Sequence, residues 1–131
     1  MEKQNANYKA EVKGCTKELT GKEKVALKNF ADMIQLDEAT QNAEGAGVII
    51  DVDYVAQVHV HNEKADNPDY MKYIYVDKDG TMYISGSEPL YRQYTDIAED
   101  MEDEKEPWSI KVIRKHSDNF KGKDFLTCVI I

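Results

Sequence analysis

The feature of this sequence that most constrains its fold is the run from Val48 to His61, in which apolar and polar side chains alternate. The apolar positions are Val48, Ile50, Val52, Tyr54, Ala56, Val58 and Val60. Alternation with a period of two is the pattern of a β-strand that turns one face toward the core. The run is long for a single strand, so we expect a bend or bulge near Tyr54–Ala56.

A β-hairpin is predicted directly downstream, over residues 72–85. Two alternating segments, 72–76 and 81–85, flank the turn sequence 77–80, in which Gly80 can adopt a positive φ at little cost. We interpret 77–80 as a turn and not as a calcium loop, because the later acidic ligand of such a loop is missing. The alternation places two sets of side chains on opposite faces: Ile74, Val76, Met82 and Ile84 on one, and Tyr73, Tyr75 and Tyr83 on the other.

One helix is expected after this hairpin, and a second hairpin after the helix. Ser87 can cap a helix that has Pro89 in its first turn, and Leu90, Tyr94, Ile97 and Met101 then form one apolar stripe. The acidic run 99–106 opposes the helix dipole and favours fraying, and Pro107 ends the helix. Residues 108–115 and 125–131 are predicted to be strands joined by a polar turn.

The N-terminal third is less defined by its pattern. Residues 7–13 alternate weakly, as a strand would, and Thr20 with Glu23 forms a capping-box pattern. Residues 25–36 fit a helix and strands equally well. Five to seven strands and one helix between a hairpin and a terminal strand pair predict a mostly-β fold, a small OB-like β-barrel. At 131 residues, 1–131 is expected to form one domain.

The net charge of -8 is unevenly distributed. Residues 1–30 hold seven lysines against four glutamates, and residues 107–131 hold five basic groups against two acidic ones, so two basic ends enclose an acidic middle. Local potential acts over a Debye length of roughly 8–10 Å, so a basic end can still meet an anion. The two cysteines, Cys15 and Cys128, are expected to be reduced, and no apolar run reaches membrane-spanning length. We therefore expect a cytoplasmic protein.

The order of segments in residues 48–131 resembles that of small single-stranded DNA-binding proteins encoded by bacteriophages of Gram-positive hosts. The likeness is carried by 73–81, 84–88, the acidic helix, 109–112 and 117–128, with weaker support from 36–40. The resemblance implies an OB-like barrel that coats single-stranded DNA during phage DNA replication in the host cytoplasm. The chain ends in an apolar strand and lacks the acidic tail of the bacterial relatives, so recruitment of partners through such a tail is not expected.

Sequence-independent binding of single strands requires aromatic faces for base stacking and cations for phosphates. Tyrosines sharing one hairpin face, with basic and aromatic residues downstream, could supply both. The alternative is that the tyrosines pack against the helix. The predicted nucleic-acid-binding residues are Tyr73, Tyr75, Tyr83, Lys111, Arg114, Lys115, Phe120, Lys121 and Lys123.

Other functions are less favoured by the sequence. His59 and His61 share a strand face with Asp53, and His116 could join them, but no further ligand at a fixed spacing completes a metal site. No nucleophile motif or phosphate-binding loop is present, so we predict neither an enzyme nor a cofactor nor a small-molecule substrate. An acidic DNA mimic, whose helix carboxylates bind a basic host protein, is the second hypothesis. The third is self-assembly through sheet edges.

Overall fold

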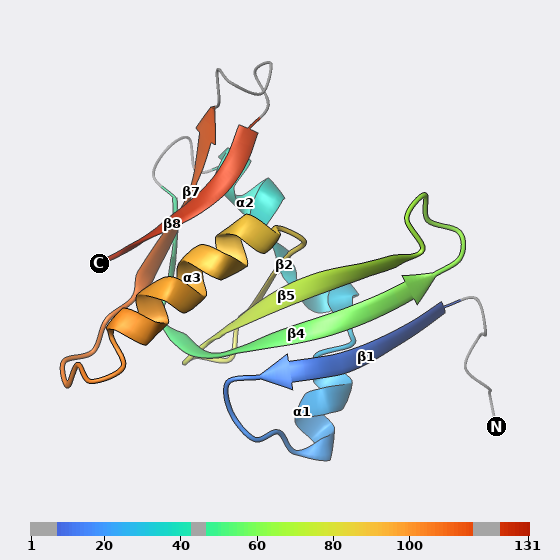
Figure 1. Cartoon of the computed structure of the whole chain (residues 1–131), viewed down its shortest axis with the longest axis horizontal. Helices are drawn as coiled ribbons and strands as arrows, with labels where there is room; N and C mark the ends of the chain where they lie inside the picture. The colour runs from blue at the N-terminus through green and yellow to red at the C-terminus, as the bar shows by residue number, and fades with distance from the viewer. Residues whose placement is uncertain (1–7, 43–46, 117–123) are drawn as a thin grey trace.

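A mostly-β fold is confirmed by the computed structural model, which describes residues 8–42, 47–116 and 124–131 (Figure 1). The helices are α1 (Gly21–Ala26), the 3₁₀ helix η1 (Phe30–Asp32), α2 (Leu36–Asn42) and α3 (Glu88–Asp100). The strands are β1 (Tyr8–Cys15), β2 (Ile34–Gln35), β3 (Val48–Ile50), β4 (Val52–Asn62), β5 (Asp69–Asp77), β6 (Met82–Ser85), β7 (Ile110–His116) and β8 (Asp124–Ile130).

The described strands form two separate sheets. The larger has the order β1-β4-β5-β6-β2 and is antiparallel except for the short β6–β2 pair, and the smaller has the order β3-β7-β8. Among the described residues no ladder joins the two sheets into a ring, so the predicted closed OB-like barrel is not seen here. Both predicted hairpins are present, as β5–β6 and β7–β8.

The long alternating run is divided at Asp51, between β3 and β4. The backbone of Asp51 bonds to the β5–β6 turn: its N–H donates to the Asp77 carboxylate (2.9 Å), and its C=O accepts from the Lys78 N–H (2.9 Å). The ladder with β5 then shifts register between Val52 and Tyr54. The chain therefore bends a few residues earlier than predicted, and its two parts enter different sheets.

The centre of the larger sheet is buried on both faces, because each face supports a hydrophobic core. On the first face, Tyr73 and Tyr75 pack with Leu90 and Tyr94 of α3 and with residues of the smaller sheet. On the second face, Ile74 and Val76 pack with Leu27 and Met33. The opposite orientation of the two predicted side-chain sets is thus confirmed, and both sets contribute to cores.

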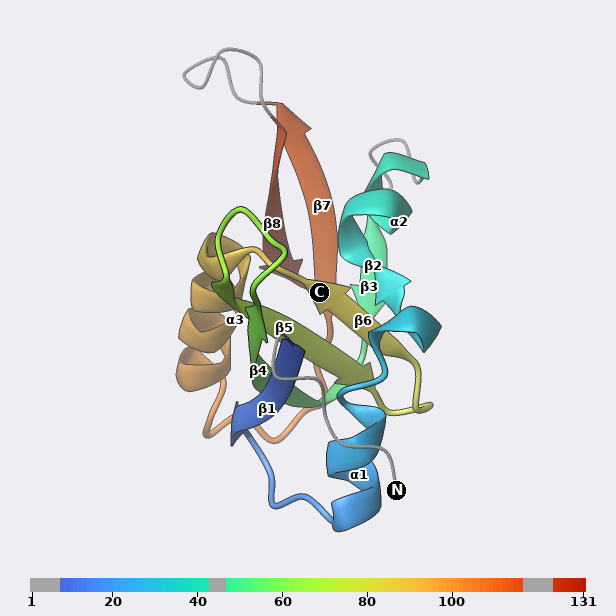
Figure 2. The ribbon, with the colours of Figure 1, turned by 90° about the vertical axis from the view of Figure 1, so that its right-hand side faces the viewer.

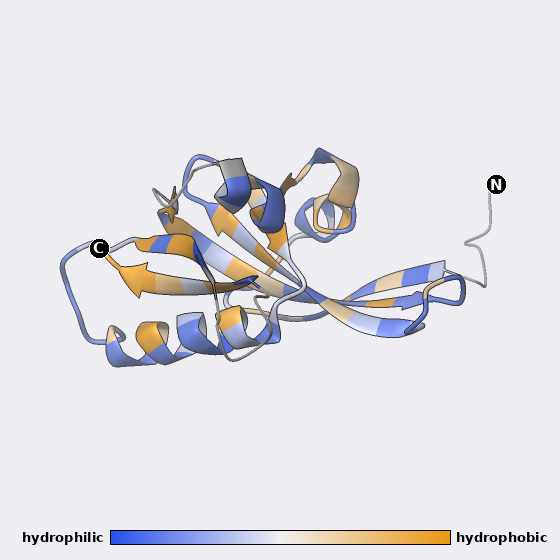
Figure 3. Ribbon diagram, turned by 90° about the horizontal axis from the view of Figure 1, so that it is seen from above, coloured by the Kyte–Doolittle hydropathy of each residue, from blue (hydrophilic) through white to orange (hydrophobic). Residues whose placement is uncertain are grey.

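α3 begins as the sequence predicts and ends earlier. The Ser87 side chain accepts a hydrogen bond from the Leu90 N–H, and Pro89 lies in the first turn. The helix ends at Asp100 and not at Pro107, which fits the cost of placing carboxylates at the negative end of the helix dipole. Hydrophobic and hydrophilic bands alternate along α3 (Figure 3).

The ambiguous residues 25–36 contain helix and strand together. Thr20 and Glu23 form the predicted capping box, so α1 begins at Gly21 and ends at Ala26. η1 and the two-residue strand β2 follow, and Leu36 begins α2. Neither single interpretation of this stretch was correct.

We predict that Tyr75→Phe leaves the free energy of unfolding unchanged or raises it by about 1 kcal/mol, because an unpartnered buried hydroxyl is costly. The Tyr75 side chain is fully buried, and no described residue hydrogen-bonds its hydroxyl. Tyr75→Ala should lower the same free energy by about 3–5 kcal/mol through the cavity it leaves. Urea unfolding followed by circular dichroism measures both, and a clear loss of stability in Tyr75→Phe would contradict the unpartnered hydroxyl.

Candidate nucleic-acid interface

The tyrosines predicted to stack on bases lie against α3. Tyr75 is 0% exposed and Tyr73 is 6% exposed. The Tyr73 ring stacks on Tyr91 with centroids 4.5 Å apart, and Tyr75 meets Tyr94 edge to face at 5.7 Å. Tyr83 is partly buried against the same core. In this conformation Tyr73 and Tyr75 have no ring face available to a base, so the alternative arrangement, packing against the helix, is the one observed.

Arg114 serves as a link between elements. Its side chain is 18% exposed, Nη2 donates to the Asp37 carbonyl at 2.6 Å, and the guanidinium lies 3.5 Å from the Asp124 carboxylate. Asp37 belongs to α2 and Asp124 to β8. Arg114 therefore ties α2 to the smaller sheet and is not available as a free phosphate ligand here.

Lys111 and Lys115 lie on the opposite side of β7 from Arg114, because side chains alternate along a strand. The β-ladders place Lys115 opposite Phe125, and Lys111 between Ile49 and Val129. Ile49, Phe125 and Val129 are 57%, 44% and 42% exposed. We call this surface the outer face of the smaller sheet, and its members are Ile49, Lys111, Ile113, Lys115, Phe125, Thr127 and Val129. Thr127, opposite Ile113, is only 7% exposed, and its hydroxyl donates to Gln93 Oε1 of α3.

The outer face combines cations with exposed apolar groups. None of its seven side chains is acidic. Asp51 follows Ile49 by two residues. Its carboxylate accepts a hydrogen bond from Ser109 and lies 3.5 Å from Lys78. The β7–β8 hairpin extends past α3 at the end that carries Lys115 and Phe125 (Figures 1 and 2). An anion that approaches this end meets the ammonium group of Lys115 beside the Phe125 ring.

Three predicted residues, Phe120, Lys121 and Lys123, lie outside the described residues. They belong to the segment 117–123 that connects β7 to β8. By sequence this segment adjoins the end of the outer face where Lys115 and Phe125 lie. The side chain of His116, which the sequence analysis considered as a third ligand beside His59 and His61, also lies outside the described part.

His59 and His61 share a carboxylate that sequence spacing did not reveal. Asp69 lies directly opposite His61 across the β4–β5 ladder. Its Oδ1 is 2.8 Å from His61 Nδ1 and 3.2 Å from His59 Nε2, while His61 Nε2 is 3.6 Å from Glu63. The described residues contain no group of three or more His, Cys, Asp or Glu side chains that could hold a metal ion. Here the two imidazoles bind Asp69.

These contacts shift the pKa values of the bonded pair in opposite directions. The hydrogen bond that His61 donates to Asp69 is the largest cause that raises the pKa of His61 above its ordinary 6.5; the contact with Glu63 adds to the rise, and partial desolvation opposes it. The hydrogen bond from His61 lowers the pKa of Asp69 below 3.8. At pH values between the lowered pKa of Asp69 and the raised pKa of His61, both side chains are therefore charged.

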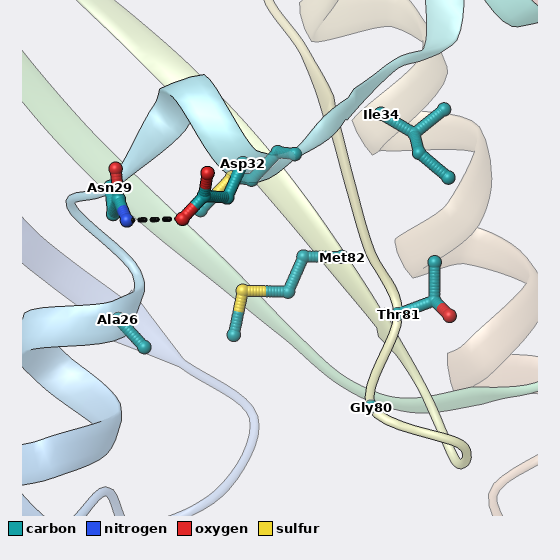
Figure 4. Close-up of a pocket in the computed structure, with 8 residues that line it drawn as sticks. Ala26, Asn29, Asp32, Ile34, Gly80, Thr81 and Met82 are labelled. Atoms are coloured by element: carbon teal, nitrogen blue, oxygen red, sulfur yellow. Dashed lines mark hydrogen bonds between the residues drawn. The ribbon is translucent and has the colours of Figure 1, made fainter.

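A pocket of about 400 Å³ lies elsewhere, between η1 and the β5–β6 turn (Figure 4). Met82 points into it, and Asn29 donates a hydrogen bond to Asp32 at its rim (2.6 Å). Asp32 is the one titratable side chain among its lining residues, which are Ala26, Asn29, Asp32, Met33, Ile34, Gly80, Thr81 and Met82. This lining supplies no pair of groups for acid–base chemistry.

Comparisons with protein-family models, curated proteins and solved structures found no match to this chain. The resemblance to phage single-stranded DNA-binding proteins therefore stays a prediction. Among the described helices, none combines the length and the apolar character needed to cross a membrane. Both cysteines are free, as expected.

Sequence reasoning missed the apolar part of the outer face. Phe125 and Val129 fell within a strand that was predicted correctly, but the sequence does not say which of its faces is uncovered. The β7–β8 register supplies that information, since it pairs Phe125 with Lys115. If the turn of this hairpin is centred on Phe120, residues equally far before and after it face each other, and Lys115 then faces Phe125.

We predict that Asp69→Asn lowers the pKa of His61 toward 6.5, because the main cause of its rise is removed. In the native protein the His61 contribution to stability is complete below about pH 6.5 and is lost as the pH rises through the raised pKa. The Asp69 contribution is present above about pH 3.8 and is lost as the pH falls through the lowered pKa. NMR titration of the imidazole protons measures the shift.

Glu63→Gln is the matched control for this titration, because its contact with His61 is longer, at 3.6 Å. It should lower the pKa of His61 by less than Asp69→Asn does. An equal or larger effect of Glu63→Gln would show that Asp69 is not the main partner.

Proposed function

We propose that this protein binds single-stranded DNA on the outer face of the smaller sheet. The observation that supports this most is the cross-strand pair of Lys115 with the 44%-exposed Phe125. An exposed ring beside an ammonium group can stack on a base while the cation contacts the adjacent phosphate. The proposal keeps Lys111 and Lys115 from the predicted site and replaces the buried tyrosines with Phe125.

The arrangement of charge on this face suits an extended strand. Lys111 and Lys115 are on one side of β7 and four residues apart, so their backbones are separated by about 13 Å. Ile113 lies between them, and Val129 lies beside Lys111. Alternating cations and apolar groups can hold phosphates and bases of one strand without selecting a sequence.

A single strand fits this face better than a duplex. Phe125 can stack only on a base whose face is free, and the bases of a duplex are already stacked on their neighbours. Phe120, Lys121 and Lys123 lie outside the described residues, so the proposed site does not include them. Binding by an open sheet face does not require the closed OB-like barrel, and a role in phage DNA replication rests on the resemblance alone.

The proposal is tested by fluorescence-anisotropy titration of a labelled oligo-dT at low and physiological salt, with duplex DNA as competitor. We expect saturable binding that weakens as salt rises, because phosphate contacts release counterions. Duplex DNA should displace the oligonucleotide poorly. Absence of binding at low salt would reject the proposal and favour the acidic mimic, since α3 and the turn after it present exposed carboxylates at Asp96, Glu99, Asp100 and Glu102.

We predict that Phe125→Ala weakens binding of oligo-dT by about 5- to 150-fold, the loss expected for one stacked base. The double variant Lys111→Gln, Lys115→Gln should reduce the slope of log affinity against log salt by about 1.4, since each phosphate contact on a single strand contributes about 0.7. The same titrations measure both quantities.

The matched control is Lys22→Gln, Lys24→Gln, which makes the same charge change on the exposed side of α1. It should leave affinity and slope close to those of the native protein. If this control weakens binding as much as the β7 variant does, DNA is responding to total charge and the outer face is not the site.

A further inference from the structure

β1 is the one long strand edge that the described elements leave uncovered. The other edge strands are β2 with two residues, β3 with three, and β8 with seven. The edge of β8 is covered by α3, where Gln93 Oε1 accepts from the Cys128 N–H (3.2 Å) and from the Thr127 hydroxyl (2.6 Å). β1 has eight residues and pairs with β4 on one side only, at the rim of the larger sheet (Figure 1).

An uncovered edge presents unpaired backbone N–H and C=O groups to which another strand can add. The ladder between β1 and β4 is regular from Tyr8 to Val12 and shifts between Val12 and Gly14. The regular part of the free edge is therefore the five residues Tyr8–Val12, long enough for a short antiparallel ladder.

The side chains of this segment are self-complementary. Lys9 and Glu11 lie on the same face of the sheet as His59 and His61, and they carry opposite charges. Tyr8, Ala10 and Val12 lie on the other face, where Tyr8 is 38% exposed. Natural edge strands are often protected by charged side chains, above all lysines, which repel a second copy of the same edge. Here the sign alternates along the strand, so a second copy can be attracted to it.

We propose that two copies of this protein associate by antiparallel pairing of β1 with β1, with the two-fold axis at Ala10. In this register Lys9 of each copy lies opposite Glu11 of the other, which gives two cross-strand ion pairs. Glu11 also lies 3.0 Å from Lys13 of its own strand, so each Glu11 carboxylate would lie between two lysines. Tyr8 lies opposite Val12 on the other face, which gives two apolar pairs. The product is a continuous sheet of ten strands.

Neighbouring registers are less favourable. An axis at Glu11 places Glu11 opposite itself and Lys9 opposite Lys13, and like charges directly opposite each other are destabilising. An axis at Val12 pairs Glu11 with Lys13, but it extends the ladder into the irregular stretch between Val12 and Gly14. The axis at Ala10 alone combines opposite charges with a regular backbone.

This inference is independent of the proposed function. β1 belongs to the larger sheet and the outer face belongs to the smaller one, so pairing does not use Lys111, Lys115 or Phe125. Failure of DNA binding would leave the β1 pairing intact, and loss of pairing would leave the outer face as it is.

The test is sedimentation-equilibrium centrifugation of the full chain over a wide concentration range, for the native protein and two single variants. Glu11→Lys places lysines opposite each other, and Lys9→Glu places glutamates opposite each other. Because two symmetric pairs change from attraction to repulsion, each variant alone should dimerise about tenfold or more weakly than the native protein.

An equimolar mixture of the two single variants should recover a dimer, because every facing pair is then one lysine and one glutamate. Recovery also shows that both variants are folded. The control mixture is Glu18→Lys with Lys22→Glu, which makes the same charge changes at exposed positions outside β1 and should show no preferential hetero-association. A native protein that stays monomeric throughout, or single variants that fail to pair when mixed, would overturn the proposal.

Discussion

β5 is buried on both of its faces, and this burial determines which other surfaces are available. Ile74 and Tyr75 are successive residues, both 0% exposed, and they belong to different cores. A strand of this kind needs a covering layer on each side. α3 and the smaller sheet cover Tyr75, while Leu27, Phe30 and Met33 cover the side of Ile74. The centre of the larger sheet is therefore enclosed, while the outer face of β3-β7-β8 and the edge of β1 are not.

Much of the local structure follows from patterns that depend on neighbouring residues alone. The Asp–Gly turn, the Ser87 cap and the Thr20–Glu23 capping box each lie where the sequence predicted them, because the bonds that make them span only two or three residues. The division of the long alternating run at Asp51 was predicted less well. It depends on hydrogen bonds from Asp51 to Asp77 and Lys78, and a pattern within 48–61 cannot contain that information. The barrel was inferred from strand number, which does not fix how the strands pair.

The residues of the candidate site also depend on tertiary contacts that a local sequence pattern does not contain. Alternation correctly placed Tyr73, Tyr75 and Tyr83 on one face, but an amphipathic strand has the same pattern whether a helix or solvent covers that face. α3 supplies its own aromatic partners: Tyr94 belongs to the apolar stripe that the sequence predicts, and Tyr91 lies outside that stripe. Lys111 and Lys115 were selected for their charge, and the structure leaves both on an uncovered face. Arg114, one residue before Lys115, is on the other face and pairs with Asp37 and Asp124.

The net charge of -8 affects how a basic face on this protein would meet DNA. At physiological salt the Debye length is about 8 Å, so a phosphate near Lys115 responds mainly to the groups around it. At low salt the field of the acidic α3 and the turn after it reaches further and opposes the approach of DNA. Added salt then weakens two effects at once: the attraction to Lys111 and Lys115, and the repulsion from the distant carboxylates. The net salt dependence should therefore be shallower than a count of lysine contacts alone would give. If DNA responded to the total charge of -8, its affinity would instead rise with added salt, because the chain as a whole repels a polyanion. DNA binding by this chain would therefore depend on a local basic face and not on the total charge.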